Sequence, residues 1–404
     1  MSKEKNEKTI VKPIDIGGDG GNSKIKIIYN NKYTSYDNIY AKDSLVDYNA
    51  MNLTDEDMDE YLRDVLNVRF TYHNGKDDMQ VQEFLFGEIA TNNKSDLEER
   101  VNADKSDDLM LTMSTILSAV TFVLENKEQE EIEPEMTLEL NFSTGLPYHE
   151  FKIIALREKY KAHYEGQHII EFLDPRSPVK KLTVNIKDVL VNSEGMSALE
   201  TTIKSQGVLT EETKEFLIDT VWCMIDIGGF TTDIIGGIFR KRKSGIKLET
   251  IDRLSKGLNY GISTSQNAAI EKIKNHYNDN DNVKTSTLKI SRKDINNAEL
   301  REGKFKGILN NRYRTNTTEF TYDEYRKLGR KIGNDFTQLF IENAQMDSLE
   351  KIYVAGGGSL NSEVIDSLIS ELENRGINKE IIEVVESPNP VYVNAVGYYL
   401  ALKK

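Results

Sequence analysis

The chain has 404 residues, roughly two to three times the length of an ordinary single domain, so at least two packed units are expected. Its net charge of −14 disfavours direct binding to nucleic-acid phosphates, which requires clustered Lys and Arg. A single cysteine, Cys223, excludes a disulfide framework and a cysteine-based zinc site, and we expect it to be a small core residue.

The N-terminal part of the chain predicts a sheet. The runs IVKPIDIGG and SKIKIIYNNKYTSY are typical of short strands, and the glycine-rich turn DGGN between them is a hairpin signal. Residues 41–100 mix acidic runs with short strand candidates, and we expect an inserted subdomain there. From Leu109 to Leu124 apolar residues recur at helical spacing, which predicts a core-facing helix, and the strand LELNFSTGLP follows.

The rest of the chain alternates strands and helices. The run LTVNIKDVLVNSEGMSALETTI predicts a strand, a polar turn and a helix, and TVWCMIDIGGFTTDIIGGIF predicts a second hairpin with a fully buried first strand. After a mainly helical stretch, KIYVAGGGSLN predicts a strand, a triple-glycine turn and the start of a helix. The chain closes with a loop and a final helix in VVESPNPVYVNAVGYYLALKK. This alternation indicates an α/β protein.

The first predicted turn has the residue types that bind a phosphate. It contains Asp19, Gly20, Gly21, Asn22, Ser23 and Lys26. Glycines let a phosphate approach the backbone, and successive amides form an anion-binding concavity. Ser23 adds a hydroxyl, Lys26 adds a charge, and Asp19 suits a hydrated Mg²⁺. A plain hairpin turn is the alternative.

The register of this turn is ambiguous, because Asp15 and Gly17 also form an Asp-x-Gly pattern. We prefer Asp19, since only that choice places a Ser four residues later and a Lys seven residues later.

Two further glycine-rich turns follow later in the chain. The second turn begins at Asp226 and continues with Gly228, Gly229, Phe230, Thr231 and Thr232, and the third consists of Gly356, Gly357, Gly358 and Ser359. The second offers amides and hydroxyls to a phosphate, and the third joins a strand to a helix, where bare backbone suits a ribose or phosphate. The alternatives are a glycine bulge in a buried hairpin and an ordinary loop. Because Asp226-x-Gly228 repeats Asp19-x-Gly21, we expect two similar halves that face each other across a cleft.

Together the three turns resemble the phosphate-1, phosphate-2 and adenosine motifs of the actin, sugar-kinase and chaperone ATPase superfamily. Within it the chain is most similar to the bacterial actin-like proteins of the ParM type, which segregate plasmids. The segments STGLPYHEF, KDVLVNSEGMSALE, SKGLNYGIS and VYVNAVGYYL also resemble that family, whereas residues 41–100 and 275–318 match least.

The resemblance implies an actin-like fold with two similar domains, each with a subdomain insertion, around a nucleotide cleft. Domain I would comprise residues 1–205, with its insertion at about 41–100, and would be completed by a C-terminal helix at about 388–404. Domain II would comprise residues 206–387, with a mainly helical insertion at about 265–345.

The resemblance also implies an ATPase that polymerises with ATP, or with GTP, and Mg²⁺, and that depolymerises after hydrolysis to segregate plasmid DNA. Glu194 would orient the water that attacks the γ-phosphate, assisted by Asp226, and Asp19 and Asp226 would hold Mg²⁺ through water. Such a role is reasonable because phosphoryl transfer depends mainly on positioning and charge neutralisation. The alternative for Glu194 is a solvated turn residue before Gly195.

The implied partners are further copies of the chain in a helical filament and a small basic DNA-binding adaptor on a centromere-like plasmid site. We expect no direct contact with nucleic acid or membrane. No run is long and apolar enough for a membrane span or a signal peptide, so a cytoplasmic location is expected. A soluble phosphotransferase similar to sugar kinases and a cell-shape or scaffold filament of the actin type are the rival functions.

Two other features are not expected to be sites. The five histidines are scattered without the spacing of zinc ligands. The basic run from Arg240 to Lys243 lies where a turn should join two strands, and a solvated turn is the expected structure.

Overall fold

The computed structural model describes residues 12–42, 66–73, 79–87, 89–90, 97–99, 104–279, 292, 295, 318–386 and 389–403. The chain divides into two compact units. Unit 1 comprises Met1–Leu146, Glu150–Ser193 and Ala395–Lys404, and unit 2 comprises Pro147–His149 and Glu194–Asn394.

The units change at Ser193 and Glu194, whereas the sequence analysis placed the domain boundary at residue 205. Helix α6 (Met196–Ser205) therefore belongs to unit 2. Unit 1 is completed by Ala395–Lys404, somewhat less than the expected segment from about 388. Much of the expected insertion at 41–100, and most of residues 280–317 of the second insertion, lie outside the described residues.

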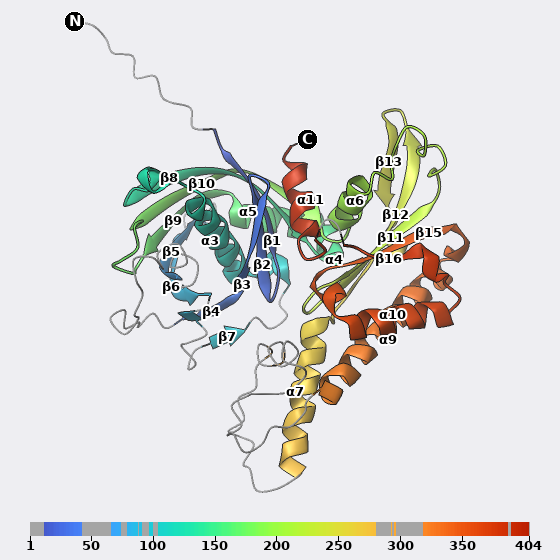
Figure 1. The fold of residues 1–404 in the computed structure, drawn as a ribbon. Coiled ribbons are helices and arrows are strands. Elements are labelled where there is room, and N and C mark those ends of the chain that lie inside the picture. Colours follow the sequence, from blue (N-terminus) through green and yellow to red (C-terminus); the bar gives the residue numbers. More distant parts are fainter. Residues whose placement is uncertain are drawn as a thin grey trace, which may run out of the picture. The chain divides into compact units, whose positions relative to one another are not determined.

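Unit 1 contains a sheet to which the described residues contribute ten strands, in the order β3-β2-β1-β8-β10-β9-β5-β6-β4-β7 (Figure 1). Strands β1 (Ile14–Gly20), β2 (Lys24–Tyr29) and β3 (Lys32–Asp37) are antiparallel neighbours, so the predicted N-terminal hairpin is confirmed. Strand β8 (Glu135–Leu146) runs parallel to β1, and β10 (Lys181–Ser193) runs parallel to β8. The remaining strands are β4 (Ile39–Ala41), β5 (Leu66–His73), β6 (Met79–Phe86), β7 (Leu97–Glu99) and β9 (Gly166–Phe172).

Helix α3 (Leu109–Glu125) packs in the core of unit 1, and the predicted helix from Leu109 to Leu124 is confirmed. Asp108 begins it, because its carboxylate accepts a hydrogen bond from the Leu111 amide at 2.8 Å. Every residue from Leu111 to Leu124 is buried, so the helix is enclosed on all sides and does not expose one face. The shorter elements of unit 1 are η3 (Lys105–Asp107), η4 (Gln129–Glu131) and α5 (Ile154–Tyr164), and α4 (Tyr148–Phe151) contains residues of both units.

Unit 2 contains a second sheet, in the order β13-β12-β11-β15-β16, with β14 paired to β12. Strands β11 (Val221–Ile227), β12 (Thr232–Arg242) and β13 (Gly245–Thr250) are antiparallel neighbours, which confirms the predicted second hairpin. Strand β15 (Leu349–Ala355) pairs in parallel with β11, β16 (Ile382–Val384) pairs in parallel with β15, and β14 spans Lys256–Leu258. Cys223 is fully buried in β11, as predicted.

The two units share one strand plan. In each, three antiparallel strands are joined in chain order, a later strand pairs in parallel with the first one, and a further strand pairs in parallel with that added strand. The prediction of two similar halves is therefore confirmed at the level of topology. As a result, each first strand is central in its sheet and is followed directly by a tight turn.

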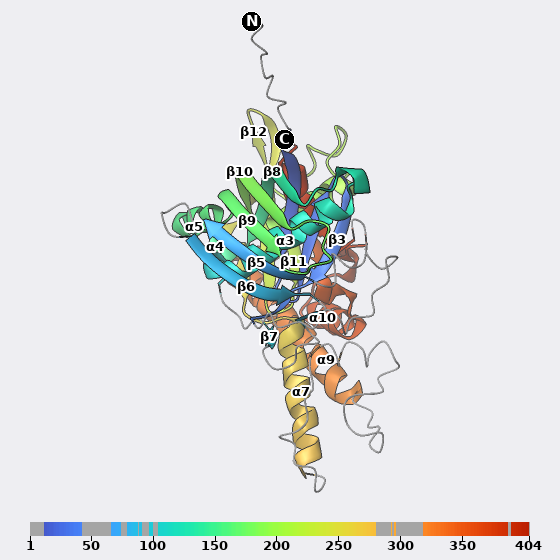
Figure 2. The ribbon, with the colours of Figure 1, turned by 90° about the vertical axis from the view of Figure 1, so that its left-hand side faces the viewer.

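The structure describes both long and short helices in unit 2. They are α6, α7 (Ile262–Asp279), α9 (Thr318–Glu342) and α10 (Ser362–Asn374), with short helices η5 (Asp252–Leu254), η7 (Met346–Ser348), η8 (Gly357–Leu360) and η9 (Lys379–Ile381). Helix α7 lies beside α9, as Figure 2 shows. Helix α11 (Val393–Ala401) closes the chain.

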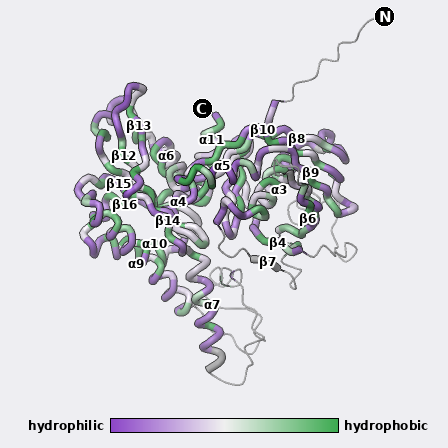
Figure 3. Tube along the Cα trace, turned by 180° about the vertical axis from the view of Figure 1, so that it is seen from behind, coloured by the Kyte–Doolittle hydropathy of each residue, from purple (hydrophilic) through white to green (hydrophobic). Residues whose placement is uncertain are grey.

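The basic run Arg240–Lys243 forms the end of β12 and the turn into β13, as predicted, and Figure 3 shows this end of the hairpin as hydrophilic. Its cations pair with nearby acids: Arg240 with Asp219, Lys241 with Glu215, and Arg242 with Glu249. Within the described residues, none of the helices has the length and hydropathy needed to cross a membrane.

Candidate functional site

The first glycine-rich turn joins β1 to β2. Asp19 and Gly20 are the last residues of β1, and the turn itself consists of residues 21–23. Asn38 holds the turn from outside, since its side-chain amide donates to the Gly21 carbonyl at 2.9 Å and its backbone amide donates to the Ser23 carbonyl at 3.0 Å. The residues predicted for this site therefore lie together, in the turn and in the adjoining ends of β1 and β2.

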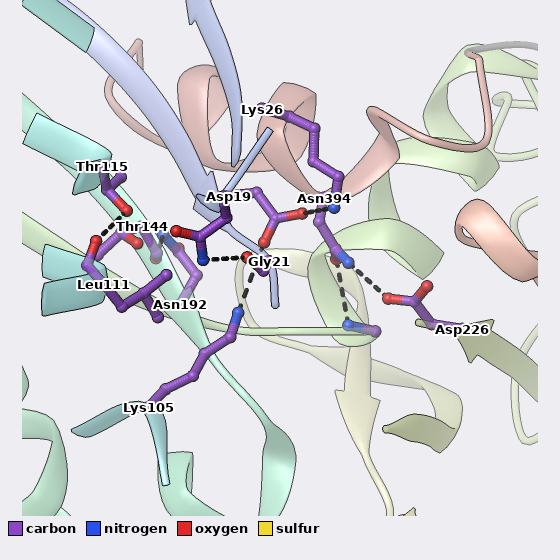
Figure 4. A network of polar contacts seen from close by, with 12 residues as sticks. Asp19, Gly21, Lys26, Lys105, Leu111, Thr115, Thr144, Asn192, Asp226 and Asn394 are labelled. Carbon is purple, nitrogen blue, oxygen red and sulfur yellow. Dashed lines mark hydrogen bonds and ion pairs between the residues drawn. The ribbon is translucent and has the colours of Figure 1, made fainter. Parts of the chain in front are cut away.

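Asp19 is a buried carboxylate between two lysines. Lys26 Nζ lies 2.9 Å from Asp19 Oδ2, and Lys105 Nζ lies 3.6 Å from Asp19 Oδ1 (Figure 4). Burial by itself raises the pKa of Asp19, but the charges of Lys26 and Lys105 outweigh it and hold that pKa below its ordinary value. Asp19 therefore carries its negative charge at neutral pH.

Lys105 was missed in the sequence analysis. It begins the short helix η3, and the Glu150 carboxylate accepts hydrogen bonds from the amides of Lys105 and Ser106 at 3.0 and 2.8 Å. This acid stabilises the amide end of the helix and keeps Lys105 beside Asp19. No local pattern marks Lys105, because its neighbours in sequence are ordinary polar residues and its partner lies on a distant strand.

The alternative acid, Asp15, has different partners. It lies near the start of β1, away from the turn, and accepts hydrogen bonds from Asn141 at 2.9 Å and from Lys403 at 2.5 Å. The position of Asp19 at the turn favours the register that places Asp19, rather than Asp15, in the first acidic position.

The second turn joins β11 to β12 and is braced by the segment before α7. The Gly228 carbonyl accepts a hydrogen bond from the Ile262 amide at 3.1 Å, and the Gly229 carbonyl accepts one from the Ser263 amide at 2.7 Å. The hydroxyl of Thr232 is fully buried and donates to the Tyr260 carbonyl at 2.9 Å. Thr232 thus braces the turn through a protein contact, whereas we expected its hydroxyl to face a ligand.

Two other predicted residues of the second turn differ in exposure. Phe230 is buried and lies against the guanidinium of Arg292, whose Cζ is 4.6 Å from the ring centroid. Thr231 is half-buried, so its hydroxyl is nearer to solvent than that of Thr232. The part of this turn open to a ligand is accordingly its backbone together with Thr231.

The two turns have the same backbone construction. The Gly21 amide donates to the Lys24 carbonyl at 3.1 Å, and the Gly228 amide donates to the Thr231 carbonyl at 2.9 Å, so each glycine bonds the residue three positions later. A Cβ at either glycine would lie within 2.9 Å of that same carbonyl oxygen, which is closer than real Cβ atoms come. Glycine is therefore required at both positions, and each turn follows an acidic residue at the end of a central strand.

Asn394 connects Asp226 to the turn that follows Glu194. Its side-chain amide donates to Asp226 Oδ2 at 2.6 Å, and its side-chain oxygen accepts a hydrogen bond from the Gly195 amide at 3.2 Å (Figure 4). Glu194 is 6% exposed, so the alternative of a solvated turn residue does not describe its position. The sequence analysis placed Asn394 in the closing helix but assigned it no role.

The third turn follows β15 and contacts the end of β11. Gly356 has φ +85°, and a Cβ there would lie 2.3 Å from Asp226 Oδ1 and 2.6 Å from the Ile227 carbonyl. The helix expected to begin at this turn, α10, begins only at Ser362, because η8 intervenes and Asn361 caps α10 by accepting a hydrogen bond from the Val364 amide at 3.1 Å. Gly356 therefore forms the turn that contacts Asp226, while Gly357 and Gly358 belong to the short helix η8 before α10.

No protein-family model and no curated protein matches the chain. Solved structures do match it. A 15-stranded ParM filament from Clostridium botulinum is 19% identical, with a TM-score of 0.69, over 97% of this chain and 99% of that chain. A ParM of Bacillus thuringiensis solved with ATP is 18% identical, with a TM-score of 0.60, over 97% of this chain and 98% of that chain.

An archaeal actin homologue is 15% identical to the chain, with a TM-score of 0.65, over 96% of this chain and 99% of that chain. These likenesses extend over nearly the whole length of each protein, and they confirm both the predicted fold class and, at the level of the fold, the predicted resemblance to ParM-type proteins. The chain is an α/β protein with the two-domain actin-like fold.

Proposed function

We propose that the protein is an actin-like ATPase that polymerises with ATP and Mg²⁺ and hydrolyses the nucleotide within the filament. The observation that carries this proposal is the duplicated turn: each unit ends its central strand with an acidic residue and follows it with a glycine whose amide bonds the carbonyl three residues later. Each of these turns is suited to bind a phosphate group.

The backbone of both turns is suited to phosphate oxygens. Among the described residues, the amides of Asn22 and Ser23 in the first turn and of Gly229 and Phe230 in the second have no protein acceptor. Successive amides of this kind form an anion-binding concavity. In the first turn, Lys26 and Lys105 add positive charge, which they now share with Asp19.

The acidic residues suit Mg²⁺, which keeps several waters and takes only one or two carboxylates beside phosphate oxygens. When bound, the ion would neutralise phosphate charge. Asp226 accepts a hydrogen bond from the neutral side chain of Asn394, and its carboxylate is the second acid we assign to the hydrated cation. Asp19 becomes available in the same way once Lys26 and Lys105 turn from it to phosphate oxygens.

Glu194 is the residue we assign to orient the attacking water. It directly precedes Gly195, which has φ +68° and begins helix α6, and its carboxylate belongs to a buried turn. A carboxylate in such a position accepts a proton from a bound water, and the rest of the rate enhancement comes from positioning and charge neutralisation.

Polymerisation is proposed from the fold and from the ParM filament that shares it. Identical copies that meet head to tail form an open helical filament when the rotation between them does not close a ring. We further propose that the filament segregates plasmid DNA through a small basic DNA-binding adaptor, for which the net charge of −14 is favourable.

High-speed sedimentation of the purified chain tests this function. We expect the chain to pellet with ATP and Mg²⁺, to release phosphate, and to stay in solution with ADP or with ATP and a chelator. GTP in place of ATP tests nucleotide choice. Electron microscopy of the pellet should show filaments.

Asp226→Ala should abolish phosphate release, whereas Asp347→Ala, which changes an exposed acid of the same unit, should not. A chain that binds ATP but stays in solution and phosphorylates a hydroxyl compound would be a phosphotransferase. A chain that forms filaments unaffected by hydrolysis would be a scaffold. Absence of ATP binding would overturn the proposal.

A further inference from the structure

We propose that Asn394 is a positioning residue for nucleotide hydrolysis, because its one side chain fixes both the Asp226 carboxylate and the turn that carries Glu194. This inference rests on the proposed function and deepens it. Asn394 is 6% exposed, and its two side-chain atoms hydrogen-bond to Asp226 Oδ2 at 2.6 Å and to the Gly195 amide at 3.2 Å.

The chemistry of the two contacts requires an amide side chain. Asp226 offers an acceptor and Gly195 offers a donor, so the residue between them must donate and accept at once. Asparagine has both functions on one short, rigid group, whereas aspartate lacks the donor and leucine lacks both. An aspartate at position 394 would also place a second carboxylate beside Asp226.

The backbone around Asn394 is itself held in place. The loop before α11 is closed by Asn389, whose side chain accepts a hydrogen bond from the Val391 amide at 3.0 Å and whose carbonyl accepts one from the Tyr392 amide at 2.9 Å. The carbonyl of Pro390 accepts a hydrogen bond from the Gly356 amide at 3.1 Å. Asn394, the second residue of α11, therefore directly follows a loop that is bonded to the third glycine turn, which itself contacts Asp226.

Asn394 therefore fixes the position of the Asp226 carboxylate relative to the turn that contains Glu194. Asp226 lies at the end of β11 and Glu194 in the turn before α6, and no regular element joins these two points directly. The Asn394 side chain supplies that connection. If it is lost, we expect nucleotide to bind through the unchanged glycine turns, while the attacking water loses its orientation relative to Asp226.

The test separates the two hydrogen bonds. Asn394→Asp keeps an acceptor for Gly195, removes the donor to Asp226 and adds a negative charge beside it, and Asn394→Ala removes both hydrogen bonds without adding a charge. Asn389→Asp is the matched control, because it adds a negative charge in the loop just before α11 and keeps its acceptor for the Val391 amide. The assays are phosphate release at saturating ATP, binding of a fluorescent ATP analogue, and thermal unfolding.

We expect Asn394→Asp to lower kcat by about tenfold or more while the Kd for the ATP analogue changes less than about threefold, since loss of a transition-state contact lowers kcat selectively. Asn389→Asp should keep the wild-type kcat. A normal kcat in Asn394→Asp, with an active wild type, would overturn the inference and leave the proposed function intact. A wild type without ATP hydrolysis would overturn both.

A double variant distinguishes positioning from stability. Combining Asp226→Asn with Asn394→Asp exchanges the amide and the carboxylate, so that one hydrogen bond between the two side chains can form again. We expect its thermal unfolding midpoint to return toward that of the wild type, while phosphate release stays low because the charge at position 226 is gone. Recovery of hydrolysis together with stability would assign Asn394 a purely structural role.

Discussion

Lys105 and Lys26 contact opposite oxygens of the Asp19 carboxylate, with Lys105 Nζ 3.6 Å from Oδ1 and Lys26 Nζ 2.9 Å from Oδ2. The buried carboxylate thus holds both ammonium groups close to the turn that follows it. Lys105 thus lies beside the first turn, although it is far from that turn in the sequence.

Lys105→Gln should weaken ATP binding about tenfold, because a point charge beside the first turn is lost. Lys187→Gln removes a lysine of the same unit that is 59% exposed and pairs with Glu139, and it should leave binding unchanged. Titration with a fluorescent ATP analogue measures both. Equal affinity in the two variants would remove Lys105 from the phosphate site.

Asp19→Asn should destabilise the protein at pH 7 by about 3 kcal/mol, because two largely buried lysines lose their carboxylate. The pKa of Asp19 is lowered in the folded state, so its contribution is fully present above the unfolded value of about 3.9 and is lost as the pH falls through the folded pKa. The stability difference from wild type should therefore shrink below about pH 4.

Urea unfolding at neutral and acidic pH checks this dependence on Asp19. Asp37→Asn is the control in the same hairpin, because its pair with Lys24 is exposed and should contribute less than about 1 kcal/mol. A deficit for Asp19→Asn that is as large at pH 3 as at pH 7 would contradict the assignment.

Glu194→Ala should bind ATP and form filaments that persist, with phosphate release lowered about 10²-fold or more because the attacking water loses its proton acceptor. Glu200→Gln alters an acid on α6 that pairs with Lys204, and it should behave as wild type. Phosphate release and sedimentation over time measure the two effects. Normal phosphate release from Glu194→Ala would exclude Glu194 from the role.

Gly356→Ala should destabilise the protein and impair hydrolysis, because the added Cβ would lie 2.3 Å from Asp226 Oδ1 in a residue at φ +85°. Gly376→Ala isolates the backbone cost, since Gly376 has φ +88° and no atom within 4 Å of the added Cβ. We expect the control to lose about 1 kcal/mol of stability and to keep wild-type hydrolysis. Equal effects of the two substitutions on phosphate release would show that the close approach to Asp226 is unimportant.

Local patterns in the sequence were enough to predict four features: the hairpins, the core helix from Leu109, the buried Cys223 and the repeated Asp-x-Gly turns. The reason is that each depends on residues within a few positions of one another: strand, glycine and strand, or apolar residues at helical spacing. The repeat of the turns also predicted two halves of like topology, which the two sheets have.

The tertiary structure decided which side chains surround those turns. Lys105 reaches Asp19 and Asn394 reaches Asp226 from distant parts of the chain, and the hydroxyl of Thr232 is taken by the Tyr260 carbonyl. No spacing rule predicts such contacts, because they depend on how elements far apart in sequence pack together. The sequence by itself thus determined the backbone of each turn, while folding decided the charges and hydrogen bonds around it.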